Sequence, residues 1–240
     1  PNLLAKIMRS ASKIEPSELR AVLLSFGFVF TLMAAYYILR PVRDAMSSNW
    51  TDAELSTLFT ATFVFSIAAV FLYGAAASRV KFRWLVPGVY GFFAVSFLAF
   101  YFAVQMSSNG VLIDKAFYVW VSVFSLFQIS VFWSLMADIF SKEQAPRLFS
   151  FIAVGSSVGA LVGPLIPLMF AGIGAANLML IAAVLLLVPL PIIGVLERIK
   201  VSGSHNEEAQ VDLTEQQVIG GNPFAGFQLF LKSPYLLGIG

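Results

Sequence analysis

The sequence predicts an all-α membrane protein, a bundle of six transmembrane helices. Hydrophobic residues make up 59% of the 240 residues and charged residues 12%, about half the charged share of a soluble domain. Six stretches of about 20 residues contain no charged side chain, which is the helical length that crosses a hydrocarbon core of about 30 Å. They are residues 21–39, 55–77, 85–106, 117–137, 149–171 and 175–196. Because backbone amides cannot stay unpaired in lipid, each stretch is expected to form one spanning helix.

The basic residues are distributed unevenly between the two sides of this predicted bundle. Eleven lie before the first stretch, between the second and third, between the fourth and fifth, or after the sixth. Only three, Arg40, Arg43 and Lys115, lie on the opposite side. By the positive-inside rule, we expect a multi-pass protein of the bacterial cytoplasmic (inner) membrane with a cytoplasmic amino terminus.

A polar segment after the sixth stretch divides the chain. Residues 1–196 are expected to form an amino-terminal six-helix bundle, 197–222 a cytoplasmic linker, and 223–240 the truncated start of a second transmembrane half. Six spans, a polar linker and a further span are the layout of a transporter built from two six-helix halves. The expected partners are therefore membrane lipid, the carboxy-terminal half of the same protein and a small-molecule substrate.

The outer end of the first stretch holds the main candidate for a substrate site. On a continuing helix, Tyr36, Arg40, Arg43 and Asp44 share one face. Pro41 predicts a kink or a break there. Guanidinium groups bind anions in bidentate pairs, so Arg43 is expected to contact an anionic substrate, with Asp44 as the counter-ion of the empty site. The alternative is that both arginines reach the lipid headgroups and mark the membrane edge.

Polar residues of the fourth stretch are further candidates. Gln128 lies near mid-membrane and is expected to face the bundle interior, as a contact between helices or as a substrate contact lining the cavity. Asp138 follows this stretch on the cytoplasmic side, and Arg147 precedes the next. The two either form a gate pair or are solvated separately. Arg79, in the loop after the second stretch, is assigned to the same gating or packing group.

The fifth stretch carries a stripe of small residues. Gly155, Gly159 and Gly163 recur at every fourth position, which allows the backbone of a neighbouring helix to approach closely. Pro164 follows directly and is expected to bend the span. This segment is interpreted as a packing surface and hinge.

Several kinds of chemistry find no support in the sequence. The chain has no cysteine and a single histidine, and no zinc-protease or nucleophile-elbow motif is visible. We therefore expect no enzyme activity, no cofactor, no metal and no nucleic-acid partner.

Two segments resemble the major facilitator superfamily. Residues 74–79, ending in Arg79, are similar to its loop between helices two and three, with Ser78 at the usual Asp and Lys81 at the usual Gly. Residues 159–164 are similar to part of the fifth-helix motif of its antiporters. The resemblance implies a major-facilitator-like half and secondary transport by alternating access.

A related family, the bacterial and plastid ATP/ADP antiporters, matches over more of the chain. Residues 37–44 resemble its first-helix stretch, with Arg43 at the place of a functional lysine. Residues 132–163 agree with it in order and spacing, but 117–128 lack the acidic residue that nucleotide-exchanging members carry. The resemblance implies nucleotide exchange (NTP for NDP). A proton-coupled exporter of a non-nucleotide compound and a non-transporting receptor or scaffold remain as alternatives.

Overall fold

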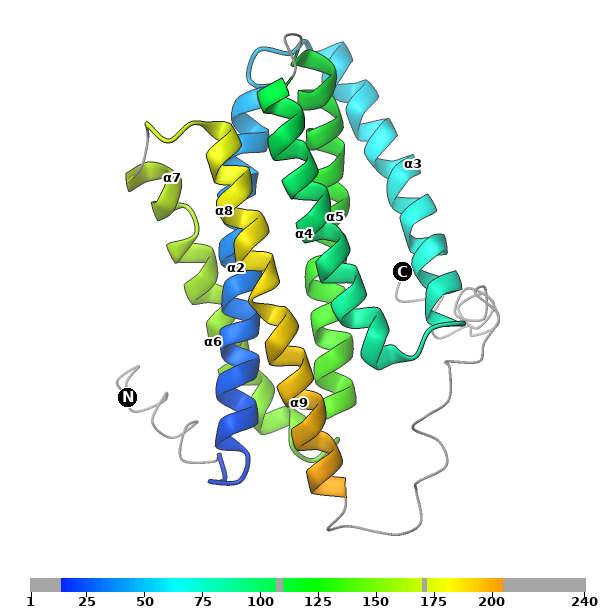
Figure 1. Cartoon of the computed structure of the whole chain (residues 1–240), viewed down its shortest axis with the longest axis vertical. Helices are drawn as coiled ribbons and strands as arrows, with labels where there is room; N and C mark the ends of the chain where they lie inside the picture. The colour runs from blue at the N-terminus through cyan, green and yellow to red at the C-terminus, as the bar shows by residue number, and fades with distance from the viewer. Residues whose placement is uncertain (1–13, 107–109, 170–171, 205–240) are drawn as a thin grey trace.

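Six membrane-spanning helical segments run the length of the molecule, as the charge-free stretches predict (Figure 1). The computed structural model describes residues 14–106, 110–169 and 172–204. The first four segments are single helices, and the last two are each divided in two. The helices are α2 (Leu19–Ser47), α3 (Asp52–Ala77), α4 (Phe82–Met106), α5 (Val111–Ile139), α6 (Ala145–Val162), α7 (Leu165–Met169), α8 (Ala175–Leu187) and α9 (Pro189–Ser204).

Most of the helices extend beyond the charge-free stretches, and at the start of α3 a polar cap supports the added residues. Thr51 caps α3: its hydroxyl accepts from the Glu54 backbone N–H at 3.3 Å, and the Glu54 carboxylate accepts from the Thr51 N–H at 2.9 Å. At the other end of the chain, α9 continues to Ser204, into the segment expected to be linker. The remaining linker residues and the expected second half, 205–240, lie outside the described residues.

Of the kink or break expected at Pro41, the break is wrong. Helix α2 continues through Pro41 to Ser47 without interruption. A proline removes only one backbone donor, and neighbouring helices can hold the flanking turns in place. Here Ile38, Leu39 and Val42 are all buried, so both turns around Pro41 are packed against other helices.

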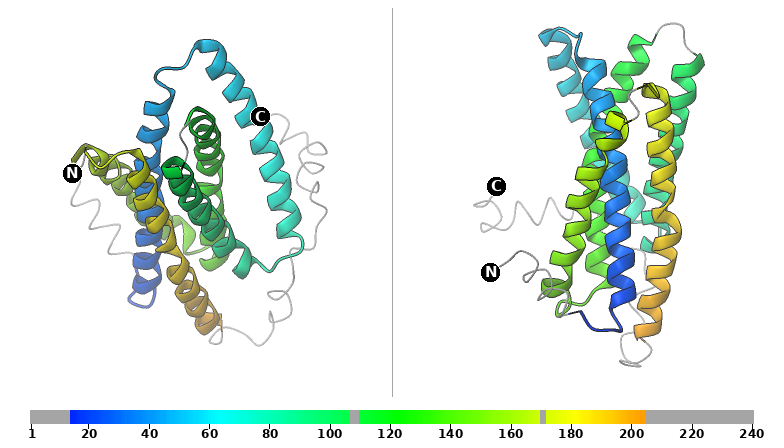
Figure 2. Two further views of the ribbon diagram at one scale, coloured as in Figure 1. Left: turned by 45° about the horizontal axis from the view of Figure 1, so that its top comes forward. Right: turned by 90° about the vertical axis from the view of Figure 1, so that its left-hand side faces the viewer.

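Helix α2 is the central element of the bundle, and α3 is the peripheral one. Helices α5, α6, α8 and α9 all pack against α2, whereas α3 packs mainly on α5. Figure 1 and the left-hand view of Figure 2 show α3, coloured cyan, at the outer edge of the bundle. Leu58 is the one residue of α3 that is buried, so nearly all of this helix is left to lipid or to a partner.

Aromatic contacts join α2, α4 and α5 in the interior. The Phe28 ring meets the rings of Tyr90 and Phe132 edge to face, with centroids 5.4 and 5.1 Å apart. Tyr90 is fully buried, and its hydroxyl donates to the backbone carbonyl of Gln128 at 2.9 Å. These contacts fix the rotation of the three helices about their own axes.

The glycine stripe of α6 lies directly against α2. A Cβ atom added to Gly155 or to Gly163 would stand 2.7 or 2.8 Å from a backbone oxygen of α2, and one added to Gly159 would also overlap such an oxygen. The three oxygens belong to Phe26, Phe30 and Ala34, in the order of the glycines. The two backbones are therefore in contact along three helical turns, which no residue larger than glycine permits.

The helix of the fifth span is interrupted directly after this contact. Helix α6 ends at Val162, Gly163 and Pro164 form a turn, and the short helix α7 completes the span to Met169. Since Pro164 has no backbone N–H, the regular hydrogen-bond pattern is interrupted at the turn.

Candidate functional site

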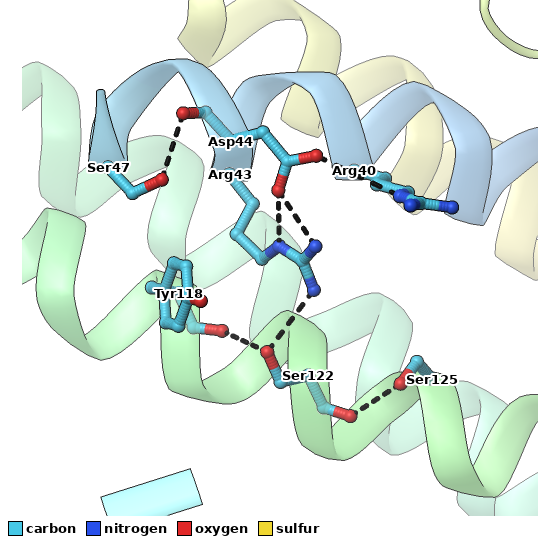
Figure 3. Close-up of polar contacts among 7 residues, drawn as sticks. All are labelled: Arg40, Arg43, Asp44, Ser47, Tyr118, Ser122 and Ser125. Atoms are coloured by element: carbon cyan, nitrogen blue, oxygen red, sulfur yellow. Dashed lines mark hydrogen bonds and ion pairs between the residues drawn. The ribbon is translucent and has the colours of Figure 1, made fainter. Parts of the chain in front are cut away.

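Arg43 is the centre of a polar cluster that joins α2 to α5 (Figure 3). Its Nε and Nη2 both donate to Oδ1 of Asp44, at 3.0 and 2.7 Å. Its Nη1 donates to the Ser122 hydroxyl of α5 at 3.3 Å, and its Cζ lies 5.3 Å from the centre of the Tyr118 ring. Only 16% of the side chain is exposed. Arg43 therefore points across to the neighbouring helix α5. A headgroup anchor would instead extend outward, away from the bundle.

Arg40 shares the same carboxylate but is held much less firmly. Its Nε lies 3.8 Å from Oδ2 of Asp44, beyond hydrogen-bond length, and 47% of its side chain is exposed. Its guanidinium also lies 5.8 Å from the Tyr37 ring. Arg40, Arg43 and Asp44, named here the arginine cluster, thus carry one positive charge in excess.

Tyr118 and Ser122 are site residues that the sequence analysis did not identify. The Ser122 hydroxyl accepts from Arg43 and donates to the Tyr118 backbone oxygen at 2.8 Å, so it is fixed by its own helix. Serine and tyrosine are common near the ends of transmembrane helices, and nothing in the chain distinguishes these two before α5 is placed beside α2. Ser125 continues the same polar edge, donating to the Ser122 carbonyl at 2.6 Å.

The other predicted site residues of the membrane interior lie within the bundle. Tyr36 is half-buried against the rings of Tyr37 and Phe124. Gln128 is 3% exposed, and its side-chain Oε1 has no hydrogen-bond partner among the described residues. Its backbone carbonyl is the acceptor for Tyr90. Whether the Gln128 side chain contacts a substrate stays a prediction.

At one end of the bundle the helices pair their charges differently from the possible gate pair of Asp138 and Arg147. Arg147, at the start of α6, donates to both oxygens of Glu18 at 2.6 and 2.9 Å. Asp138, at the end of α5, pairs with Lys200 of α9 at 3.3 Å. The structure thus gives Asp138 and Arg147 separate partners, while Arg79 lies exposed in the loop after α3.

Glu18 is a buried carboxylate just before α2. Burial raises the pKa of its carboxyl group, but hydrogen bonds from the Glu15 backbone N–H, Arg147 and Gln144 outweigh burial and lower the pKa below 4.5. The ionised form therefore ties the start of α2 to the start of α6. An acidic residue at the edge of the first span, among basic neighbours, is the one sequence feature that points to it.

The charged and polar side chains of the described residues are arranged as pairs between helices. Within the described ranges, no group of three or more His, Cys, Asp or Glu side chains is placed to hold a metal ion. The polar contacts instead join pairs of helices near their ends: α2 to α5, α3 to α5 through Lys115 and Glu54 at 2.8 Å, and α2 to α6.

Comparisons with curated proteins and with solved structures find no match. The family model described as the Major Facilitator Superfamily matches residues 22–240, which is most of the chain and begins within α2. The six apolar helices agree with that match. The chain therefore belongs to the Major Facilitator Superfamily of secondary transporters, multi-pass membrane proteins that bind small molecules.

Proposed function

We propose that this protein exchanges a small organic anion across the bacterial inner membrane by alternating access. The described residues would belong to its amino-terminal half, with the amino terminus in the cytoplasm. The arginine cluster would bind the anion, and the carboxy-terminal half would complete the site. Nucleotides are the substrate class suggested by the resemblance of residues 37–44 to the ATP/ADP antiporters.

The observation that carries this proposal is the direction of the Arg43 side chain. A guanidinium that served as a headgroup anchor would extend outward, because there it keeps its water of hydration. Arg43 is instead enclosed by Asp44, Tyr118 and Ser122, which removes most of its water. Charges kept inside a membrane protein at that cost usually serve a substrate or ion path. The excess positive charge of the arginine cluster favours an anion.

A non-nucleotide anion is the second candidate. The favouring observation is that residues 117–128 contain no acidic side chain, where nucleotide-exchanging relatives carry one. Phosphate, carboxylate and sulfonate groups all form the bidentate pairs that guanidinium provides, so the arginine cluster alone does not select among them.

The other predicted residues have supporting places in this proposal. Gln128 would line the substrate path, and the contact of α6 with α2, ending at Pro164, would act as the surface and hinge on which α7 moves. The pairs Arg147–Glu18 and Asp138–Lys200 would hold the cytoplasmic ends together in one of the two transport states.

The test is anion exchange by the full-length protein in proteoliposomes. Vesicles loaded with ATP, ADP, orthophosphate or glycerol 3-phosphate are assayed for uptake of the labelled anion, per folded molecule. Arg43→Ala should abolish exchange without reducing membrane insertion. Lys115→Ala is the matched control, because it removes a paired positive charge at the same end of the bundle. Exchange at the wild-type rate in Arg43→Ala would refute the site, and uptake driven only by a proton gradient would favour an exporter. Absence of uptake for every anion would favour a receptor or scaffold.

A further inference from the structure

The two arginines of the cluster differ so much in their surroundings that they cannot perform the same task. We infer that Arg40 is the residue that contacts the anion, and that Arg43 is a positioning residue, fixed by Tyr118 and Ser122, that sets the place of Arg40 through their shared carboxylate, Asp44. This inference rests on the proposed anion site and assigns roles within it.

Most of the hydrogen-bonding capacity of Arg43 is already in use. An arginine carries five N–H donors, and three of those on Arg43 are already directed at Asp44 and Ser122. One face of its guanidinium is covered by the Tyr118 ring. Asp44 occupies the Nε–Nη2 edge of the Arg43 guanidinium, so an anion that bound this edge in a bidentate manner would have to displace it.

Arg40 has the opposite character. In the part of the chain that the structure describes, its one charged partner is Asp44, at 3.8 Å, which is well beyond the usual 2.7–2.9 Å of a charge-assisted hydrogen bond. Nearly half of its side chain is exposed. An incoming anion can therefore pair with the Arg40 fork while disturbing only this long contact.

Asp44 connects the two roles because each of its oxygens faces a different arginine. Arg43 holds Oδ1 with two hydrogen bonds, and Oδ2 is left toward Arg40. The carboxylate is 52% exposed, so its position depends on Arg43 more than on packing. Ser122 and Tyr118, which belong to α5, fix Arg43 in turn, and the position of Arg40 on α2 is thereby coupled to α5.

This division predicts different kinetic effects for the two groups of residues. Arg40→Lys keeps the charge but loses the planar fork, so KM should rise about 10-fold with little change in kcat. Ser122→Ala removes one support of Arg43 and should raise KM by only about 2- to 5-fold. Ser122→Thr, which keeps the hydroxyl, should restore KM. A residue with a merely structural role would change the amount of folded protein and leave KM as it is.

Chemical modification separates contact from positioning directly. The full-length protein in proteoliposomes is treated with phenylglyoxal, which reacts with guanidinium groups, and modified arginines are mapped by mass spectrometry with and without ATP or orthophosphate. Arg40 should react readily and be protected by at least one of the anions. Arg43 should react slowly in both conditions, and Ser122→Ala should increase its reaction. Arg79, which is exposed in the loop after α3 and does not belong to the arginine cluster, is the internal reference that neither anion should protect.

The outcomes distinguish this inference from the proposed function. Protection of Arg43 overturns the division of roles, whether or not Arg40 is protected as well. Lack of protection of Arg40 by both anions overturns it too. If anion exchange is measured and only the protection pattern disagrees, the proposed function stands and the inference fails. If no anion is exchanged or protects either arginine, both fail.

Discussion

The contact between α2 and α6 makes Gly159 the position where a single methyl group should cost the most. An added Cβ at Gly159 would overlap the Phe30 backbone oxygen and stand 3.0 Å from the Met33 Cβ. At the neighbouring Gly155 the corresponding distance to a backbone oxygen is 2.7 Å, where ordinary contacts begin near 3.4 Å, so the helices would have to separate by about 0.7 Å. Forcing such a shift in a packed interior costs about 1–3 kcal/mol. We therefore expect Gly159→Ala to lower the unfolding free energy by about that amount.

The matched control is Gly91→Ala, in the middle of α4. No atom lies within 4 Å of a Cβ built at Gly91. Alanine is favoured over glycine in a helix by up to about 1 kcal/mol, so this variant should be neutral or slightly more stable than wild type. The opposite signs of the two changes are the substance of the prediction, because both are the same chemical substitution in a spanning helix.

The assay is unfolding of the purified protein in mixed micelles with increasing sodium dodecyl sulfate, followed by tryptophan fluorescence. The double variant Gly155→Ala/Gly159→Ala should lose less than the sum of the single losses, because the first methyl group already separates the helices. Gly159→Leu should prevent stable folding. If the unfolding free energy of Gly159→Ala equals that of wild type and that of Gly91→Ala, then α6 does not touch α2 as described.

Three further predictions concern the ends of the helices. The pKa of Glu18 is lowered, so its stabilising contribution is present above pH 4.5 and is lost as the pH falls through the lower native value; the stability difference between wild type and Glu18→Gln, measured at pH 7 and pH 3.5, should therefore shrink in acid. Arg147→Ala should cost about 3 kcal/mol because it leaves the buried Glu18 carboxylate without its arginine partner, whereas Lys200→Ala should cost about 1 kcal/mol or less in the same unfolding assay. For topology, the chain offers a cysteine-free background: Arg79→Cys should be labelled by an impermeant maleimide only from the cytoplasmic side and Ser48→Cys only from the outer side, and the reverse pattern would contradict the basic-residue asymmetry.

The spans could be predicted from the sequence because bilayer thickness alone sets their length. Their ends could not, since these depend on local contacts such as the Thr51 and Glu54 cap. A break at Pro41 follows from local backbone geometry alone, which leaves out the neighbouring helices that pack around the turns of α2 on either side of it.

The site was only partly visible in the sequence for a similar reason. Local spacing brought Arg40, Arg43 and Asp44 together correctly on one helix face. The residues facing them, Tyr118 and Ser122, depend on how α5 is rotated about its axis, and no spacing along the chain specifies that rotation. The same applies to Arg147, whose partner Glu18 lies 129 residues earlier.

That separation has a consequence for how the protein is made. Helix α2 leaves the ribosome before α6, which closes on it through the glycines and through Arg147. At 5–20 residues per second, α2 waits roughly 6–26 s in the membrane before the chain reaches Arg147. During that interval the face of α2 that meets these glycines, which includes Phe26, Phe30 and Ala34, lacks its α6 partner. An insertion machinery or chaperone that keeps this face occupied would therefore raise the yield of folded protein, and rare codons placed between α5 and α6 would lower it.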